Sequence, residues 1–232
     1  MKKKKIFISH IALDEVLALE LKRWIETAFR GQCEVFVAGS FQDIRPGEQW
    51  IRKVRQSLVS CDLLLVICSR KSINSRWVLF ETGAIWGREV TILPICCDSA
   101  VDLPVPFAEN QLLNFSDPDF SKKLIESVAA ALGLPDKSPA WVNKMTMGLQ
   151  KAYRRAKLDG DIIDRIRHAR EKKGLSRKDC TAASLAAHFR ESLNVMKKNL
   201  NALKMKGYLR PVHNVMIGDY YLLTPKTERL LR

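Results

Sequence analysis

Trp77 and Glu81 are the residues of this 232-residue chain whose types and spacing most directly suggest chemistry. They lie four residues apart in a segment that predicts a helix, so their side chains share one face. A fixed carboxylate can stabilise positive charge that develops in a transition state, and a neighbouring indole can stack on a flat or cationic ring. A purely structural interpretation is equally simple: Glu81 complements the helix dipole and Trp77 anchors the core.

The helix that carries this pair belongs to an alternation of short apolar runs and helical patterns. Strands are expected at 6–8, 34–37, 63–68 and 91–95, and helices at 17–29, 50–58, 77–87 and 119–132. The continuous apolar run 63–68 suits a central strand covered on both faces. The alternation predicts an α/β fold, with a parallel sheet between two layers of helices.

Ligands of such sheets bind at the carboxyl ends of the strands. Four segments follow the strands on this rim: Ser9-His10, 39–46, 69–77 and 97–106. Polar groups that could donate hydrogen bonds to a phosphate or a ribose there are Ser9, Gly39, Ser40 and Arg45. The sequence contains neither G-x-G-x-x-G nor G-x-x-x-x-G-K-[ST], which argues against a Rossmann dehydrogenase and a P-loop NTPase.

Several ordered motifs in residues 5–132 resemble bacterial TIR (Toll/interleukin-1 receptor) domains. They are Lys5-Ile6-Phe7-Ile8-Ser9-His10, then Val35-Phe36-Val37 with Pro46-Gly47-Glu48-Gln49-Trp50, and the stretch from Cys68 to Ala84. The resemblance implies a flavodoxin-like five-stranded parallel sheet. It also implies cleavage of NAD⁺ to nicotinamide and linear or cyclic ADP-ribose, which many TIR domains perform, while others act only as scaffolds.

The same resemblance assigns site residues. The family glutamate falls on Glu81, and the aromatic residue four positions earlier falls on Trp77. NAD⁺ is then a substrate, and no cofactor or metal is expected. The substrate-binding residues expected are Ser9, His10, Gly39, Ser40, Arg45, Ser69 and Trp77. Cleavage passes through an oxocarbenium-like transition state, and nicotinamide leaves as a neutral molecule, so no base has to remove a proton first.

Homotypic assembly is also implied, through the loop 39–46. Phe41 and Ile44 are the candidate contacts. In the alternative interpretation, both side chains fold back onto the base of their own loop.

Charge divides the chain into two halves. Residues 1–135 carry 17 basic and 16 acidic side chains, whereas residues 136–232 carry 22 basic and 9 acidic, a net of +13 out of +14. This step predicts two domains with different partners. A polyanion, DNA or RNA, suits the basic half, although a solvated lysine-rich surface would give the same count.

The basic half resembles a winged helix-turn-helix domain, a small α+β fold. We expect a TIR domain at 1–133, a linker and connecting helix at 134–157, and the winged helix at 158–232. Thr181 and Ser192 are predicted to cap two helices, the second ending at Gly207. Strands at 208–212 and 220–224 and a short helix from Pro225 then close the chain.

The helix after Ser192 is predicted to be amphipathic. Its apolar stripe is Leu193, Met196, Leu200 and Leu203, and its polar face includes Asn194, Lys197, Lys198 and Asn201. The resemblance places such a helix in the DNA major groove. Lys197, Lys198 and Lys204 would contact phosphates, Asn194 and Asn201 would read bases, and Arg210 follows in the first strand. In the alternative, the domain docks onto a protein.

Cysteine usage and hydropathy complete the expectations. The six cysteines include no C-x-x-C pair, and three of them, Cys61, Cys68 and Cys96, lie in or beside apolar runs that predict buried thiols. We expect a cytoplasmic protein with no membrane partner, since no stretch of 18 apolar residues occurs. Three functions remain open: an NAD⁺-cleaving defence effector switched on by assembly, a transcription regulator with a non-catalytic TIR module for oligomerisation or nucleotide sensing, and an adaptor.

Overall fold

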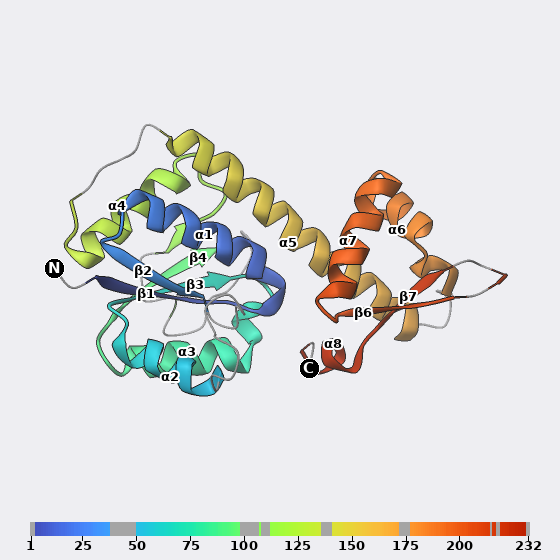
Figure 1. Ribbon diagram of the computed structural model, residues 1–232, viewed down its shortest axis with the longest axis horizontal. Helices are drawn as coiled ribbons and strands as arrows, with labels where there is room; N and C mark the ends of the chain where they lie inside the picture. The colour runs from blue at the N-terminus through green and yellow to red at the C-terminus, as the bar shows by residue number, and fades with distance from the viewer. Residues whose placement is uncertain are drawn as a thin grey trace. The chain divides into compact units, whose positions relative to one another are not determined.

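The computed structural model describes residues 3–37, 50–97, 107, 112–135, 141–171, 177–213, 215–216 and 219–230. The chain forms two compact units, residues 1–156 and 157–232 (Figure 1). No described helix combines the length and hydropathy needed to cross a bilayer.

A sheet of five parallel strands forms the centre of the first unit, in the order β2-β1-β3-β4-β5. The strands are β1 (Lys4–Ser9), β2 (Cys33–Val37), β3 (Leu63–Cys68), β4 (Thr91–Cys96) and β5 (Leu113–Asn114). The predicted α/β fold with a flavodoxin-like sheet is confirmed. All of β3 is buried, as its apolar run predicts for a central strand. The two-residue β5 is too short to show in the hydropathy pattern, although the family resemblance implies a fifth strand.

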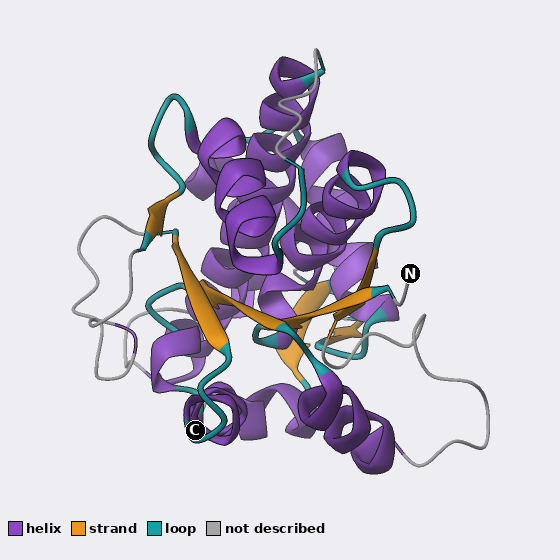
Figure 2. Cartoon of the chain, turned by 90° about the vertical axis from the view of Figure 1, so that its left-hand side faces the viewer, coloured by secondary structure: helices purple, strands orange, loops and turns teal. Residues whose placement is uncertain are grey.

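Helices cover both faces of this sheet (Figure 2). On one face lie α1 (Glu15–Ala28), α4 (Phe120–Leu132) and the first part of α5 (Val142–Glu171); on the other lie α2 (Trp50–Ser60) and α3 (Arg76–Trp86). Successive strand residues point to opposite faces. In β3, Leu65 and Ile67 therefore join the core under α1 and α4, whereas Val66 and Cys68 join the core under α2 and α3. Short 3-10 turns occur at Ala12–Asp14, Ser72–Asn74 and Arg177–Cys180.

The segment expected to be a linker and connecting helix contributes to the first core. Its helical part and the helix expected after residue 158 form one element, α5, of 30 residues. Met145, Leu149 and Ala152 are buried in the cluster that contains α1 and α4.

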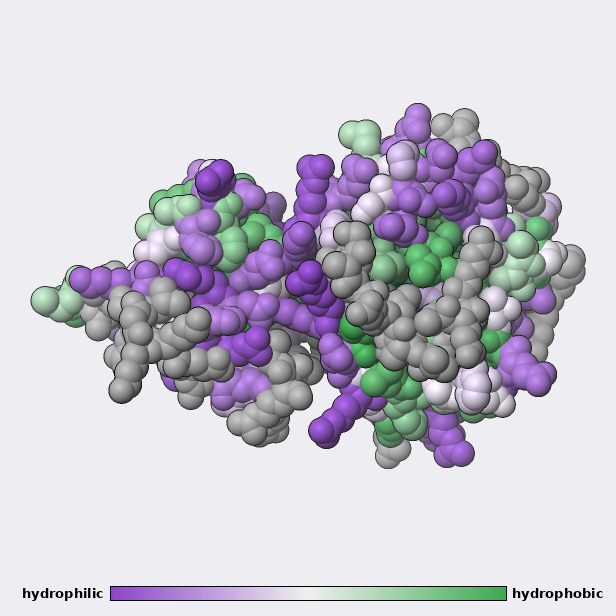
Figure 3. Space-filling model, turned by 180° about the vertical axis from the view of Figure 1, so that it is seen from behind, coloured by the Kyte–Doolittle hydropathy of each residue, from purple (hydrophilic) through white to green (hydrophobic). Residues whose placement is uncertain are grey.

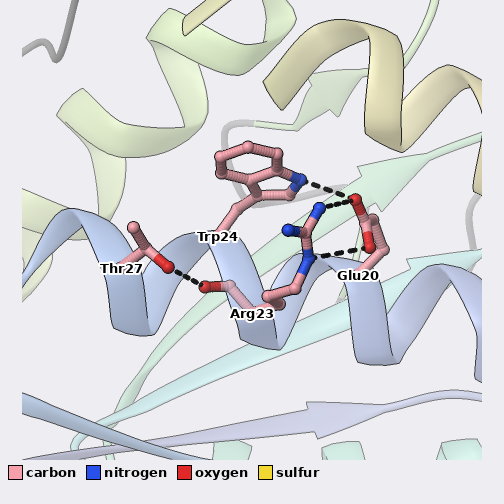
Figure 4. A network of polar contacts seen from close by, with 4 residues as sticks. All are labelled: Glu20, Arg23, Trp24 and Thr27. Atoms are coloured by element: carbon pink, nitrogen blue, oxygen red, sulfur yellow. Dashed lines mark hydrogen bonds and ion pairs between the residues drawn. The ribbon is translucent and has the colours of Figure 1, made fainter. Parts of the chain in front are cut away.

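A polar and aromatic cluster fastens α5 to α1. Trp24 stacks on Trp141 with ring centroids 5.1 Å apart, and its Nε1 donates a 2.7 Å hydrogen bond to Oε1 of Glu20. Arg23 donates to both oxygens of the same carboxylate and lies 4.2 Å from the centroid of the Trp24 ring (Figure 4). Gly148 of α5 passes so close that a Cβ there would lie 2.5 Å from Glu20 Oε1. A side chain at this position would force the end of Glu20 to shift away from Trp24.

The second unit contains the rest of α5, then α6 (Ala182–Phe189), α7 (Leu193–Met205), an antiparallel hairpin of β6 (Leu209–Val212) and β7 (Tyr220–Leu223), and α8 (Pro225–Leu230). Both predicted caps are confirmed: the hydroxyls of Thr181 and Ser192 accept hydrogen bonds from Ser184 N and Val195 N, at 3.2 and 3.3 Å. Gly207, with φ 75°, follows α7 in the left-handed conformation that glycine favours.

The predicted apolar stripe of α7 is wrong at one residue. Met196, Leu200 and Leu203 are buried, but Leu193 is 42% exposed because it is the first residue of the helix. Asn199 takes the fourth buried position, at 2% exposure. It lies three residues after Met196 and four before Leu203, so helical spacing places its polar side chain on the inward face.

Candidate active site

The candidate site lies where the carboxyl ends of β1 and β3 meet α3. Ser9 is the last residue of β1, and Ser69 directly follows β3. Ser75 caps α3, accepting a hydrogen bond from Val78 N at 3.5 Å. The cap fixes where α3 begins, which places Trp77 in the first turn and Glu81 in the second. Attraction to the helix dipole is confined to the first turn, so it does not account for Glu81.

The carboxylate of Glu81 is buried, with 0% of the residue exposed. Ser9 Oγ donates a 2.5 Å hydrogen bond to its Oε2. Among the described residues, Oε1 has no hydrogen-bond partner. A buried acceptor left in this state costs about 1–3 kcal/mol, so it needs an explanation, and a catalytic role is one of those open to it. Oε1 is therefore left over for a donor other than the residues that the structure describes.

Burial raises the pKa of Glu81 to about 7, and hydrogen bonds from the side chains of Ser9 and Trp77 hold it below the value that burial alone would give. At neutral pH both protonation states are then populated. A strongly shifted carboxyl pKa at the edge of a parallel sheet is a feature of catalytic sites, and some structural carboxyls share it.

Trp77 links the carboxylate to the helix surface. Its half-buried side chain packs against the core under α2 and α3 and lies close enough to Glu81 to lower the pKa of that carboxyl. Its ring also contacts Phe80, with centroids 5.7 Å apart. The structure thus brings together Ser9, Trp77 and Glu81, three of the residues expected from the sequence.

A second group of polar side chains lies after β3. Ser69 Oγ donates to Oδ2 of Asp14 at 3.1 Å. Ser72 is fully buried; its hydroxyl donates to Ile67 O at 2.6 Å and accepts from Ser69 N at 2.7 Å. The sequence alone does not single out Asp14, because an acid just before a helix is typical of an N-terminal cap. Asp14 can be recognised as the buried partner of Ser69 only in the fold, where β3 pairs with β1 and the segments that follow these strands come together.

The remaining predicted substrate contacts are only partly described. His10 is buried, at 5% exposure, directly after β1. Gly39, Ser40 and Arg45 lie outside the described residues, as do the candidate assembly contacts Phe41 and Ile44.

The Cys68 thiol near this rim is unreactive because of its environment. All six cysteines are free and buried, as predicted for Cys61, Cys68 and Cys96. Burial, together with the neighbouring Cys96 and Asp14, raises the pKa of Cys68 to about 12. A thiol with such a pKa is a poor nucleophile at neutral pH, so Cys68 is a core residue.

In the second unit, the predicted nucleic-acid contacts all lie on the surface. Asn194, Lys197, Lys198, Asn201 and Lys204 are exposed along α7, and Arg210 is exposed on β6.

Comparisons with known proteins address the first unit. The TIR domain family matches residues 6–128, more than half of the chain. No curated protein matches the sequence. Among solved structures, one match is to the TIR domains of the activated Roq1 resistosome that directly recognises the pathogen effector XopQ. The identity is 15%, the match covers 66% of this chain and 84% of that chain, and the TM-score is 0.31. This likeness is too distant to bear on activity.

Proposed function

The chain belongs to the TIR domain family, and from this premise we propose that it cleaves the bond between nicotinamide and ribose in NAD⁺, with Glu81 as the catalytic carboxylate. The observation that carries the proposal is the buried Oε1 of Glu81, which lacks a partner among the described residues and lies at the carboxyl edge of the sheet. This edge is where parallel α/β sheets bind ligands.

The reaction breaks the bond between ribose C1′ and the pyridinium nitrogen. The electron pair of that bond goes to the ring nitrogen, so nicotinamide leaves neutral and positive charge develops on the ribose. An ionised Glu81 stabilises this charge, and its Oε1 accepts a hydrogen bond from a ribose hydroxyl. Water then adds to C1′ and loses a proton, which gives ADP-ribose. Attack by an atom of the same molecule gives a cyclic product.

The other residues of the site have supporting roles in this proposal. Ser9 holds Oε2 and so leaves Oε1 to the substrate. The indole of Trp77 stacks on a base or on the nicotinamide ring. His10 and Ser69, together with Gly39, Ser40 and Arg45 of the loop outside the described residues, contact the ribose and phosphates.

The test is nicotinamide release from NAD⁺ by the full chain, with and without DNA or RNA. Glu81→Gln should abolish release, because an amide cannot stabilise the charge. The matched control is Glu89→Gln, an exposed glutamate shortly after the same helix, which should keep wild-type activity. Absence of nicotinamide under every condition, or full activity of Glu81→Gln, contradicts the proposal.

For the second unit we propose nucleic-acid binding by a winged helix, with assembly of the TIR domains as the consequence. The exposure of all five polar residues along α7 supports this role, and so does the net charge of +13 in residues 136–232. Such a protein would be a bacterial defence effector. A transcription regulator is the alternative, and it predicts sequence-specific DNA binding without any nicotinamide release.

A further inference from the structure

One side chain of α5 reaches the carboxyl edge of the sheet, the edge at which the candidate site lies. Tyr153 Oη donates a 2.9 Å hydrogen bond to the backbone carbonyl of Cys97, the residue directly after β4. The ring of Tyr153 packs on Phe115, the residue directly after β5, with ring centroids 4.8 Å apart. A single residue of α5 therefore contacts the chain where it leaves two neighbouring strands.

Backbone hydrogen bonds extend this contact toward β3. Phe115 N donates to Cys96 O, and Cys97 N donates to Cys68 O, each at 2.9 Å. Cys68 is the last residue of β3 and directly precedes Ser69, one of the expected substrate contacts. The position of Cys97 is thus tied on one side to α5 and on the other to the strand that leads into the candidate site.

The part of α5 that carries Tyr153 is well anchored in the first unit. In Figure 3, hydrophobic residues of this unit gather at its lower edge, where α2 and α3 lie. The apolar side of α5 is instead buried, at 7% exposure or less, over the residues Met145, Leu149, Ala152 and Ala156. Because packing locks the helix in place, it also fixes where the hydroxyl of Tyr153 lies.

We propose that Tyr153 is a positioning residue for the substrate: its hydroxyl fixes Cys97 at the end of β4 and so sets the spacing between this strand end and Ser69 after β3. Ligands of parallel sheets bind at these strand ends. Glu81 is held by Ser9 at the end of β1, so Tyr153 acts on the other side of β3. The effect on β4 is independent of the proposed function, whereas the effect on substrate binding rests on it.

Tyr153→Phe isolates the role of the hydroxyl, because it keeps the ring that packs on Phe115. The matched control is Thr146→Val, which also removes one hydroxyl from α5. The Thr146 hydroxyl donates a 2.7 Å hydrogen bond to Ser121 Oγ, and so contacts α4 rather than the end of a strand. A difference between the two variants therefore reports on the contact with Cys97 and not on a general loosening of α5.

Hydrogen exchange of the full chain, followed by mass spectrometry, reads the contact without any turnover. In Tyr153→Phe, amides of residues 91–97 should exchange roughly two- to tenfold faster than in the wild type, the range that corresponds to one uncharged hydrogen bond. Thr146→Val should leave exchange in this segment unchanged. Equal exchange at 91–97 in Tyr153→Phe and the wild type would overturn the proposal, and so would equal acceleration by both variants.

Steady-state nicotinamide release tests the effect on the substrate. Tyr153→Phe should raise KM for NAD⁺ roughly two- to tenfold and leave kcat close to that of the wild type, because it weakens substrate and transition-state binding alike. Thr146→Val should change neither constant. An unchanged KM in Tyr153→Phe would overturn the substrate role of Tyr153 and leave the catalytic proposal for Glu81 standing.

Calorimetric titration with NAD⁺ separates failure of this proposal from failure of the proposed function. A wild type that binds NAD⁺ and releases no nicotinamide contradicts the proposed function. The substrate role of Tyr153 then stands if the dissociation constant rises in Tyr153→Phe, and it falls if the two constants are equal. A full chain that does not bind NAD⁺ overturns both proposals at the substrate, and hydrogen exchange still decides whether Tyr153 fixes the end of β4.

Discussion

Ser9 Oγ donates a 2.5 Å hydrogen bond to Oε2 of Glu81, a contact between residues 72 positions apart in the sequence. It joins the last residue of β1 to the second turn of α3. Ser9 is in register with Val66 of β3, and β3 leads through the Ser69–Ser72 turn into α3. The position of the carboxylate is therefore set by the pairing of β1 with β3, and the hydroxyl leaves one carboxylate oxygen for another donor.

Ser9→Ala should shift the pH profile of nicotinamide release to higher pH. The hydroxyl lowers the pKa of Glu81, which burial raises to about 7, so its loss raises that pKa further. A hydrogen bond to a charged group contributes about 1.5–3 kcal/mol, which corresponds to an upward shift of about one pH unit or more. The measurement is kcat/KM between pH 6 and pH 9. In the wild type it should rise with pH through about 7 as Glu81 ionises.

The control for this variant is Thr27→Ala, which removes an exposed hydroxyl bonded to its own helix at Arg23 O. It should leave the profile unchanged. If the midpoint of the pH profile is the same in Ser9→Ala as in the wild type, Ser9 does not control the ionisation on which the rate depends.

Glu81→Gln should reduce the dependence of stability on pH. The pKa of Glu81 is raised from 4.5 in the unfolded chain to about 7 in the folded protein. Between these values the folded state binds more protons, so stability contributed by the protonated group is present below pH 4.5 and is lost as pH rises through about 7. The loss amounts to about 3 kcal/mol. Because glutamine does not titrate, this part of the dependence of the unfolding free energy on pH should be absent in Glu81→Gln.

Urea unfolding at pH 5 and pH 8 measures this effect. The wild type should lose more stability than Glu81→Gln between the two values. Parallel losses in the two proteins would show that Glu81 ionises in the fold as easily as in water, and the buried, perturbed carboxyl would no longer support a catalytic role.

Much of the architecture could be predicted from the sequence because the spacing of apolar residues reflects the periods of helices and strands. The run 63–68 predicts a buried strand, and the structure places β3 there. The regular spacing of apolar residues likewise predicts α1, α2 and α4 to within a few residues. Two features escape this reasoning. β5 is too short to show a pattern, and the role of Met145 and Leu149 in the first core depends on contacts with α1 and α4 that are distant in sequence.

The residues of the candidate site were easier to predict than the contacts between them. Four-residue spacing places Trp77 and Glu81 on one side of α3, and both contribute to the site. The hydrogen bond from Ser9 to Glu81 and that from Ser69 to Asp14 connect residues 72 and 55 positions apart. Such contacts follow from strand order, which the local pattern does not contain. Asn199 in α7 is a different case. Its polarity alone would place it on the surface, but it occupies a buried position of the helix.

Gly148→Ala should cost more stability in the wild type than in Glu20→Ala. In the wild type, the new Cβ would lie 2.5 Å from Glu20 Oε1 and 3.0 Å from Trp24 Nε1, so the hydrogen bond between these side chains must break or shift. In Glu20→Ala only the 3.0 Å approach to Trp24 Nε1 remains, and the helix propensity of alanine, worth about 1 kcal/mol over glycine, offsets it. We expect a coupling energy between positions 20 and 148 of about 1–2 kcal/mol.

Unfolding free energies of the four proteins of this cycle give the coupling directly. Gly83→Ala is the control, because a Cβ at this helical glycine would meet nothing within 4 Å. It should stabilise the protein equally with and without Glu20. Additive effects at positions 20 and 148 would show that α5 does not pack on α1 through this carboxylate.

Nucleic-acid binding by the second unit should depend on salt through the lysines of α7. Each phosphate contact contributes about −0.9 to the slope of log K against log salt concentration for duplex DNA. Lys197 and Lys198 are both exposed on α7. Replacing both by alanine should lower affinity for all duplex sequences alike and make the slope less steep by nearly two. The control is Lys144→Ala, which replaces an exposed lysine of α5 in the first unit and should change neither the affinity nor the slope.

Asn201→Ala should instead weaken discrimination between sequences and leave the salt slope intact, because an amide contacts bases without releasing counterions. An affinity for duplex DNA and RNA that does not vary with salt, or a slope that the two lysines do not affect, would contradict phosphate contacts by α7.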